Sequence, residues 1–316
     1  MTVLSTNLTE ETMIESVFDI KNSKLLCIIN PISGQRKIAS YEETVKRLLG
    51  PKARSLEIAH TKFRGHAAEI ARQGADEGRI ILVVGGDGTF NEVGSVLVKT
   101  NAVIGLIPKG SGNGLACEWK IPLEPEAACK GLLNSKILTI DAGKFNSRYF
   151  FNIAGIGLDA QVGWAFDKHP TRGKLPYYYL TLKEMAFHKM PAIEVTINGH
   201  ERVMKPLLVA FANGKQYGDG AEIAPKASMT DGLLHAVMIP ETPIWKVAIE
   251  ASRLFNKTMD QCSFAETLTL KEAVLHLPEP LPYHLDGEPF CDAQEIRVGI
   301  LPEALRVLVP QDYPLK

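Results

Sequence analysis

The sequence predicts a two-domain protein of the α/β class, in which a doubly wound parallel-sheet domain is followed by an antiparallel, sandwich-like β domain. Up to residue 141, strands that are apolar throughout alternate with helical segments, and this order is typical of βαβ units whose sheet is covered on both faces. Beyond that residue, short β-like runs are separated by glycine, proline and asparagine, which favours antiparallel pairing. The 316 residues suffice for two cores of ordinary size.

The first domain is expected over residues 24–141, after an N-terminal extension at residues 1–23. The apolar runs predict strands at residues 25–29, 56–60, 80–84 and 103–107, and the segments between them predict helices at residues 38–49, 66–77 and 90–99. Gly50-Pro51 and Gly78 end the first two helices, because glycine and proline terminate helical structure.

The second domain is expected over residues 142–299. Its β-like runs lie at residues 149–153, 193–197, 207–211, 233–239, 267–270 and 273–277, and helical insertions are expected at residues 177–188 and 243–259. The end of the chain, residues 295–309, is again strand-like and can pair with either domain. We assign residues 300–316 to a C-terminal segment that returns to the first domain.

Charge and composition exclude several classes of protein. The net charge is −1, so no nucleic-acid partner is expected from bulk electrostatics. The chain has no apolar run of about 20 residues, which a membrane-spanning helix requires. Its N-terminus lacks the basic start and apolar stretch of a secretory signal. The five cysteines are scattered without a Cys-x-x-Cys pair and the histidines form no ligand pattern, so we expect reduced thiols, no transition metal and a cytoplasmic protein.

The strongest local signal is the turn from Gly85 to Thr89, which joins a β-branched strand to a helix. Gly85, Gly86 and Gly88 leave the backbone N–H groups accessible, and the following helix directs its positive end to the same place, as in phosphate-binding loops. Asp87 would repel phosphate by itself, but it fits if Mg²⁺ bridges it or if it accepts a proton from an attacking hydroxyl. A purely conformational turn is the competing interpretation, since Thr89 and Glu92 also have the spacing of a capping box.

Two further loops favour the phosphate-binding interpretation over the purely conformational one. Residues 30–37 follow the first strand and residues 108–114 follow the fourth, and both loops are rich in glycine, serine or asparagine. The carboxyl ends of parallel strands meet at one edge of a sheet, where ligands bind. Three such loops at one edge therefore favour a phosphate site.

The acidic motifs of the second domain have competing interpretations from the residues alone. Asp286-Gly287, followed by Glu288, has the composition of a hairpin turn. Asp231-Gly232 has the same interpretation, and Asp159 can equally be a turn residue.

The chain resembles the diacylglycerol kinase catalytic family, which includes bacterial lipid kinases and eukaryotic sphingosine and ceramide kinases. The resemblance runs from about Leu25 to the C-terminus. It depends on six motifs in order: residues 30–34 (Asn-Pro-Ile-Ser-Gly), 85–92, 108–113 (Pro-Lys-Gly-Ser-Gly-Asn), 157–160, 230–234 (Thr-Asp-Gly-Leu-Leu) and 286–288.

The resemblance implies an N-terminal α/β domain, a C-terminal β-sandwich domain and ATP bound between them with Mg²⁺. The residues that it implies at the nucleotide are Asn30, Pro31, Ser33, Gly34, Thr61, Gly85, Gly86, Gly88, Thr89, Glu92, Ser111, Gly112 and Asn113.

The same resemblance implies separate roles for the acidic residues. Asp87 would act at the transferred phosphate, either through Mg²⁺ or as the general base, and Glu288 would be the leading candidate for the general base. Asp231, with the carbonyl groups of Ser228 and Leu233, would match a structural Mg²⁺ site, and Asp159 would face the lipid. Gly114 departs from many bacterial members, which carry an acidic residue there, and resembles the sphingosine-type kinases.

The predicted function is ATP-dependent phosphorylation of a lipid hydroxyl, of diacylglycerol or of a sphingoid or ceramide-like alcohol. NAD kinase, which shares the Gly-Gly-Asp-Gly-Thr turn, and a nucleotide-binding regulator without catalysis are the alternatives. We expect transient contact with the inner face of a membrane, for which the apolar-basic stretch at residues 164–188 is one candidate. The sequence leaves a homodimer open.

Overall fold

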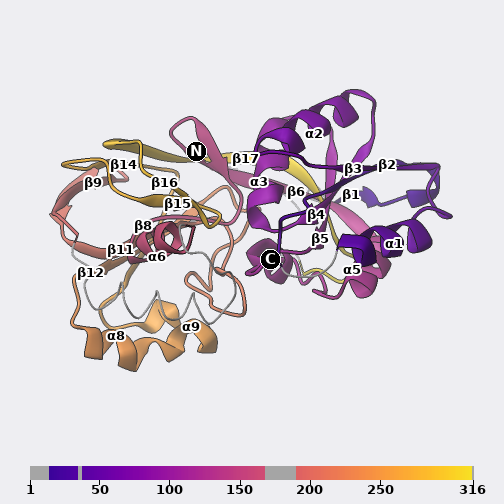
Figure 1. Ribbon diagram of the computed structural model, residues 1–316. Helices are drawn as coiled ribbons and strands as arrows, with labels where there is room; N and C mark the ends of the chain where they lie inside the picture. The colour runs from indigo at the N-terminus through magenta and orange to yellow at the C-terminus, as the bar shows by residue number, and fades with distance from the viewer. Residues whose placement is uncertain (1–13, 35–37, 168–189, 315–316) are drawn as a thin grey trace, which may run out of the picture.

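The structure is a computed structural model that describes residues 14–34, 38–167 and 190–314. Two domains lie side by side, with the C-terminal strand running between them (Figure 1). The fold class is as predicted: an α/β domain with parallel strands, followed by a domain built around an antiparallel sheet.

The first domain is built on four parallel strands in the order β5-β4-β2-β3. Their bounds are β2 Lys24–Ile29, β3 Ser55–His60, β4 Ile80–Gly85 and β5 Val103–Pro108. Every residue of β5 is buried, as expected for a strand covered on both faces.

The helices of this domain cover both faces of the sheet. Helix α2 packs beside α3, and α1 packs beside α5; Figure 1 shows the two pairs on opposite sides of the strands. The helix bounds are α1 Ile38–Leu48, α2 His66–Asp76, α3 Asp87–Leu97, α4 Gly114–Glu118 and α5 Pro125–Leu132.

The segment before the first parallel strand differs from the expected extension. Strand β1 (Ile14–Val17) pairs with β6 (Ser135–Phe145), and the short 3-10 helix η2 (Ile20–Asn22) follows it. Phe18 and Ile20 are buried in the core of the first domain. From Ile14 onward the segment therefore belongs to the fold, since its apolar side chains complete that core.

A long antiparallel ribbon joins the two domains. Strand β17 (Glu295–Pro310) pairs with β6 along most of its length, with β5 at its end and with β14 (Glu272–His276) at its beginning. One sheet thus extends through both domains. The expected boundary between residues 299 and 300 falls inside this single strand.

The second domain packs an antiparallel six-stranded sheet against the extension of the first sheet. The six-stranded sheet has the order β13-β12-β11-β8-β15-β16, and an apolar core that includes Phe145, Phe211 and Tyr283 fills the space between the two layers. The remaining strand bounds are β7 Arg148–Phe150, β8 Ile153–Gly157, β9 Ile193–Ile197, β10 His200–Met204, β11 Pro206–Ala212, β12 Leu234–Pro240, β13 Glu266–Leu270, β15 Tyr283–Leu285 and β16 Glu288–Phe290.

Three helices cover the other face of the six-stranded sheet, over a second apolar cluster. They are α6 (Leu158–Asp167), α8 (Ile244–Glu250) and α9 (Ser252–Asn256), followed by the 3-10 helix η3 (Met259–Gln261). The insertion predicted at residues 243–259 is thus helical, whereas the one predicted at residues 177–188 lies outside the described residues. No helix in the described parts of the chain has the length and apolar character needed to cross a membrane.

Candidate active site

The three loops singled out in the sequence contact one another at the carboxyl ends of β2, β4 and β5. Asn30 Nδ2 donates a hydrogen bond to Thr89 Oγ1 over 2.9 Å, and Ser33 Oγ lies 3.3 Å from the same oxygen. The Lys109 ammonium group donates to the carbonyl oxygen of Ser33. The first loop is therefore tied to both of the others, and the three form one surface.

Glycine is required where these loops touch. Gly34 has a positive φ of 57°, and a Cβ atom there would lie 1.9 Å from the carbonyl oxygen of Lys109. A Cβ atom on Gly86 would lie 2.9 Å from Gly110 Cα. No side chain fits at these positions, so the backbone itself lines the surface.

The N-terminus of helix α3 opens onto the same surface. Gly86 is its N-cap residue, and no side chain of the described residues caps it through a hydrogen bond. The first N–H groups of a helix carry partial positive charge and bind anions. With three glycines before and inside its first turn, this helix end can accept a phosphate group at close range.

Asp87 connects this turn to the next helix. Its carboxylate accepts hydrogen bonds from the backbone N–H groups of Gly114 and Leu115, at 2.8 and 2.9 Å, and so caps the N-terminus of α4. Burial raises the pKa of Asp87 to about 6, although these two hydrogen bonds act in the opposite direction. The residue is therefore both a structural cap and a carboxylate at the surface formed by the three loops.

Gly114 has a steric explanation in this chain. A Cβ atom there would lie 2.6 Å from Asn152 Nδ2 and 2.8 Å from the carbonyl oxygen of Tyr217. Tyr217 belongs to a loop of the second domain, residues 213–222, that packs directly on the loop at residues 108–114. An acidic side chain at position 114 would displace this loop.

The turn at Asp286-Gly287 joins β15 to β16 as a two-residue hairpin, with φ values of 50° and 83°. The Asp286 side chain accepts hydrogen bonds from the N–H groups of Phe151, Asn152 and Ile153 and from Asn91 Nδ2. Asn91 lies on α3, so Asp286 anchors the second domain to the helix that begins at Asp87. Burial raises the pKa of Asp286, and its hydrogen bonds oppose that rise.

Glu288 follows this anchor and faces the first domain. Its carboxylate forms an ion pair with Arg64, whose side chain is 70% exposed. A Cβ atom on Gly88 would lie 3.7 Å from Glu288 Oε2. The carboxylate of Glu288 therefore lies opposite the first turn of α3, where the two domains meet.

Asp159 lies in a polar cluster beside that turn. Its Oδ2 atom accepts a hydrogen bond from Tyr217 Oη at 2.8 Å and lies 3.1 Å from His284 Nε2. The Gly287 N–H donates to His284 Nδ1, which assigns the proton of a neutral His284 to Nε2. Both His284 and Asp159 are largely buried, at 5% and 13% side-chain exposure. The cluster links α6 to the hairpin that carries Glu288.

Comparison with known proteins agrees with this arrangement of loops. Residues 24–145 match the diacylglycerol kinase catalytic domain, and residues 152–309 match the YegS C-terminal NAD kinase beta sandwich-like domain. This chain belongs to the diacylglycerol kinase catalytic family. The predicted resemblance is confirmed, and the match to a kinase catalytic domain makes the chain a phosphotransferase.

The chain matches several members of this family over most of their length. A protein of Pseudomonas aeruginosa named probable lipid kinase YegS-like is 30% identical over 273 residues, which cover 83% of this chain and 87% of that protein. A diacylglycerol kinase of Mycobacterium tuberculosis is 27% identical over 302 residues, covering 91% and 96%. The crystal structure of a diacylglycerol kinase from Bacillus anthracis has a TM-score of 0.71 at 19% identity, covering 93% of this chain and 99% of that one, which shows a shared fold.

Two of the residues expected at the nucleotide of this kinase-family chain form hydrogen bonds within the protein. Glu92 Oε1 accepts hydrogen bonds from the N–H groups of Ala67 and Ala68, at 2.7 and 3.3 Å, so Glu92 caps helix α2. Asn113, with a φ of 53°, exchanges two hydrogen bonds with the backbone of Gly110 and shapes its loop.

The remaining expected nucleotide residues line the loops. Thr61 directly follows β3 and donates its N–H to the carbonyl oxygen of Ile29. The Gly85 carbonyl accepts from the Lys109 N–H at 2.8 Å, and the Pro31 carbonyl lies 3.4 Å from Lys109 Nζ. Ser111 and Gly112 are exposed in the third loop.

The residues expected at a structural metal lie in one loop before β12. The Asp231 carboxylate accepts the Leu233 N–H at 3.0 Å, and Ser228 Oγ lies 3.3 Å from Thr230 Oγ1. Asp141 reaches the same loop through the Gly232 N–H. Burial raises the pKa of both Asp141 and Asp231, because it disfavours the ionised carboxylates. A nearby cation would stabilise the ionised form of each. Among the residues that the structure describes, no three His, Cys, Asp or Glu side chains gather as a metal cluster.

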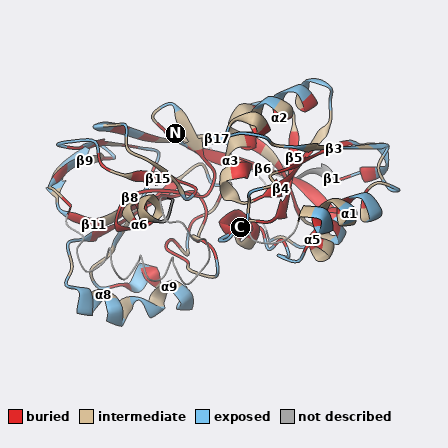
Figure 2. Ribbon diagram, in the orientation of Figure 1, coloured by how far each residue is buried: buried red, intermediate tan, exposed pale blue. Residues whose placement is uncertain are grey.

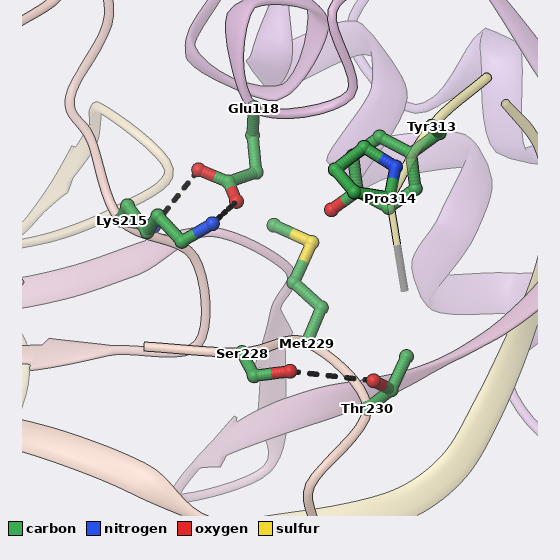
Figure 3. A pocket seen from close by; sticks show the side chains of 7 residues that line it. All are labelled: Glu118, Lys215, Ser228, Met229, Thr230, Tyr313 and Pro314. Carbon is green, nitrogen blue, oxygen red and sulfur yellow. Dashed lines mark hydrogen bonds and ion pairs between the residues drawn. The ribbon is translucent and has the colours of Figure 1, made fainter. Parts of the chain in front are cut away.

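A small cavity lies beside Glu118, at the end of α4, and not at the surface formed by the three loops (Figure 3). Its volume is about 20 Å³, room for roughly one water molecule. Glu118, at the end of α4, accepts the Lys215 N–H at 3.0 Å beside it, and its carboxylate lies 3.5 Å from Lys215 Nζ. The cavity is therefore part of the contact between α4 and the loop at residues 213–222, and it is too small for a substrate.

Sequence reasoning missed the importance of Tyr217 and Asn91. Both act through contacts between residues far apart in the chain. The only local signal for Tyr217 is the glycine-rich run around it, Gly214, Gly218 and Gly220, since such loops permit close backbone contact. Asn91 occupies an ordinary helical position, and no sequence pattern marks it.

Proposed function

We propose that this protein is an ATP-dependent lipid kinase, which transfers the γ-phosphoryl group to a hydroxyl of diacylglycerol or of a sphingoid or ceramide-like alcohol. The observation that carries the proposal is the position of Glu288 opposite the open N-terminus of α3, next to Gly88. The acceptor class is supported by the printed names of the relatives, which are lipid kinases and diacylglycerol kinases.

The nucleotide would bind on the surface formed by the three loops. Its phosphates fit the glycine-lined backbone, because a Cβ atom at Gly86 would meet Gly110 and the first N–H groups of α3 lack a side-chain cap among the described residues. Ser33, Thr89 and Ser111 would add hydroxyl donors around them. This cradle can hold polyphosphate without a Gly-Lys-Ser/Thr motif.

Acidic residues would hold Mg²⁺ at two places. Asp87 lies at the phosphate-binding surface, and Asp231 lies with Asp141 in the loop before β12. When bound at Asp87, Mg²⁺ supplies charge neutralisation for the phosphate oxygens. The ion at Asp231 would order the loop that follows it, with the carbonyl groups of Ser228 and Leu233 as further ligands.

Glu288 would accept the proton of the attacking lipid hydroxyl. Its ion pair with the exposed Arg64 holds the carboxylate at the domain interface, and such an exposed pair contributes only about 0–1 kcal/mol. Breaking this ion pair to accept a substrate hydroxyl would therefore cost little. Asp159, held by Tyr217 and His284, would orient the polar head of the lipid beside it.

The test is incubation of the protein with γ-labelled ATP and Mg²⁺, with either dispersed lipids or NAD as acceptor. The proposal predicts label in organic-phase lipid, and a panel of diacylglycerol, sphingosine and ceramide identifies the acceptor. Label in NADP would instead establish NAD kinase activity. ATP binding without transfer to any acceptor would establish a nucleotide-binding protein without catalysis.

A further inference from the structure

The helices α8 and α9 carry an exposed apolar surface. Eight large hydrophobic side chains are exposed in the described residues, and half of them lie within twelve consecutive positions of this segment. They are Ile244, Trp245, Ile249 and Phe255, which are 47%, 60%, 66% and 57% exposed. We call these four residues the α8–α9 patch.

Exposure of the α8–α9 patch to water is energetically unfavourable. Helix α8 has seven residues, none of them buried, and it is attached to the second domain through the half-buried Val247. An isolated helix of this length is unstable in water, and its exposed isoleucine and tryptophan side chains gain nothing from solvent. Figure 2 shows both helices at the outer edge of the domain, mostly exposed or partly buried. The patch therefore fits a partner surface that accepts apolar side chains.

The charges around the patch identify that surface. Residues 243–257 contain three cations, Lys246, Arg253 and Lys257. Arg253 pairs with Glu250 and Lys257 pairs with Glu222, so among the described residues Lys246 is the cation of this segment without an acidic partner. Lys246 Nζ lies 5.5 Å from the centre of the Trp245 ring, so a cation and an aromatic ring are exposed together. Basic residues beside tryptophan and aliphatic side chains on a short helix suit the interface of an anionic bilayer.

A second copy of the chain fits the patch less well. Symmetric pairing would bring Lys246 and its neighbours on one copy against the same cations on the other. The patch consists of four exposed side chains, whereas each partner of a stable dimer contributes about 20–30 residues to its interface. Charge and size both favour a lipid surface.

We propose that the α8–α9 patch docks this protein on anionic membranes. The proposal rests on the proposed lipid kinase function, which requires the protein to meet an acceptor that resides in a bilayer. The candidate stretch named from the sequence, residues 164–188, is a different segment and falls mostly outside the described residues.

The docking helices are tied directly to the candidate active site. The Glu222 N–H donates to the Leu254 carbonyl at 2.8 Å, and the Glu222 carboxylate pairs with Lys257 Nζ at 2.8 Å. Glu222 ends the loop whose Tyr217 contacts both Asp159 and Gly114. Helix α9 is thus linked to the polar cluster at Asp159 through the loop at residues 213–222.

The experiment is co-sedimentation of the full chain with vesicles made of equal parts phosphatidylglycerol and phosphatidylcholine. The test variant is Trp245→Gln combined with Ile249→Gln. Its matched control is Val203→Gln, because Val203 is a 68% exposed apolar residue on β10, in the opposite layer of the same domain. We expect at least a tenfold loss of vesicle affinity in the double variant, an unchanged affinity in the control, and weaker binding to pure phosphatidylcholine or at high salt.

The outcomes separate this proposal from the proposed function. Wild-type affinity in the double variant, or a dimer in sedimentation equilibrium that the double variant abolishes, would overturn the docking surface. Kinase activity toward a water-dispersed short-chain lipid should be the same in both variants and the wild type. If the wild type binds vesicles through the patch but phosphorylates no lipid, the docking surface stands and the kinase proposal fails.

Discussion

Two acidic turns flank the candidate site, and the protein holds their carboxylates in opposite ways. Asp87 and Asp286 accept hydrogen bonds from backbone N–H groups, two and three of them respectively, and both are anchored inside the fold. Glu288, two residues after Asp286, is held by the long and exposed side chain of Arg64. We infer that the two kinds of carboxylate have different roles. Asp87 and Asp286 hold the elements of the site in place, and Glu288 accepts the proton.

The largest effect on catalysis is expected for Glu288→Gln. Loss of a positioned proton acceptor lowers a rate by about 10²–10⁴-fold. Turnover with labelled ATP and lipid should fall by that factor, while thermal unfolding and ATP affinity stay at wild-type values. A variant that keeps most of its turnover would remove the assigned role of Glu288.

The largest effect on stability is expected for Asp286→Asn. An amide has one oxygen in place of two, and its NH₂ group would face donors in the protein, so buried N–H groups lose their acceptor. We expect a loss of about 2–4 kcal/mol in the free energy of unfolding in urea. Asp260→Asn is the control, since Asp260 only pairs with an exposed lysine. Equal stability of the two variants would show that Asp286 is not an anchor.

The dependence of activity on pH tests the raised pKa of the buried Asp87 carboxyl group. Burial raises its pKa to about 6, so the carboxylate is protonated below that pH and ionised above it. We expect kcat/KM to rise as the pH rises through about 6 and this limb to disappear in Asp87→Asn. Because the folded pKa exceeds the unfolded value of 3.8, folding stability from this group falls as the pH rises between these values. A profile without a limb near pH 6 would contradict this behaviour.

The smallest effect is expected for Arg64→Ala. An exposed ion pair contributes about 0–1 kcal/mol, so kcat/KM should change by less than about fivefold. Thermal stability should stay within the error of the measurement. A loss as large as that of Glu288→Gln would mean that Arg64 contacts the transferred phosphate itself.

The sequence was sufficient to predict the fold class and the meeting of the three loops. Apolar strands and glycine-rich turns at residues 30–34, 85–89 and 108–114 are local signals, and the edge of a parallel sheet brings such turns together. Glu92 shows the limit of local reasoning. Its place in the motif predicts nucleotide binding, which stays a prediction, whereas its capping of α2 depends on that helix beginning beside it in space and has no local signal.

Contacts between the domains could not be predicted from the sequence. Gly114 was identified as a missing carboxylate, whereas the structure explains it by the Tyr217 backbone, which is distant in the chain. The hairpin at Asp286 was identified from its composition, but its bond to Asn91 depends on how the two domains pack. The pairing of β17 with strands of both domains is likewise a result of tertiary packing, which local patterns do not encode.

The most direct test compares lipid phosphorylation by the wild type and by Glu288→Gln, with ATP binding measured on the same samples. The predicted result is label in organic-phase lipid for the wild type, its near-complete loss in the variant, and equal ATP affinity in both. Equal transfer by the two proteins, or a wild type that labels NAD and no lipid, would contradict a lipid kinase in which Glu288 accepts the proton.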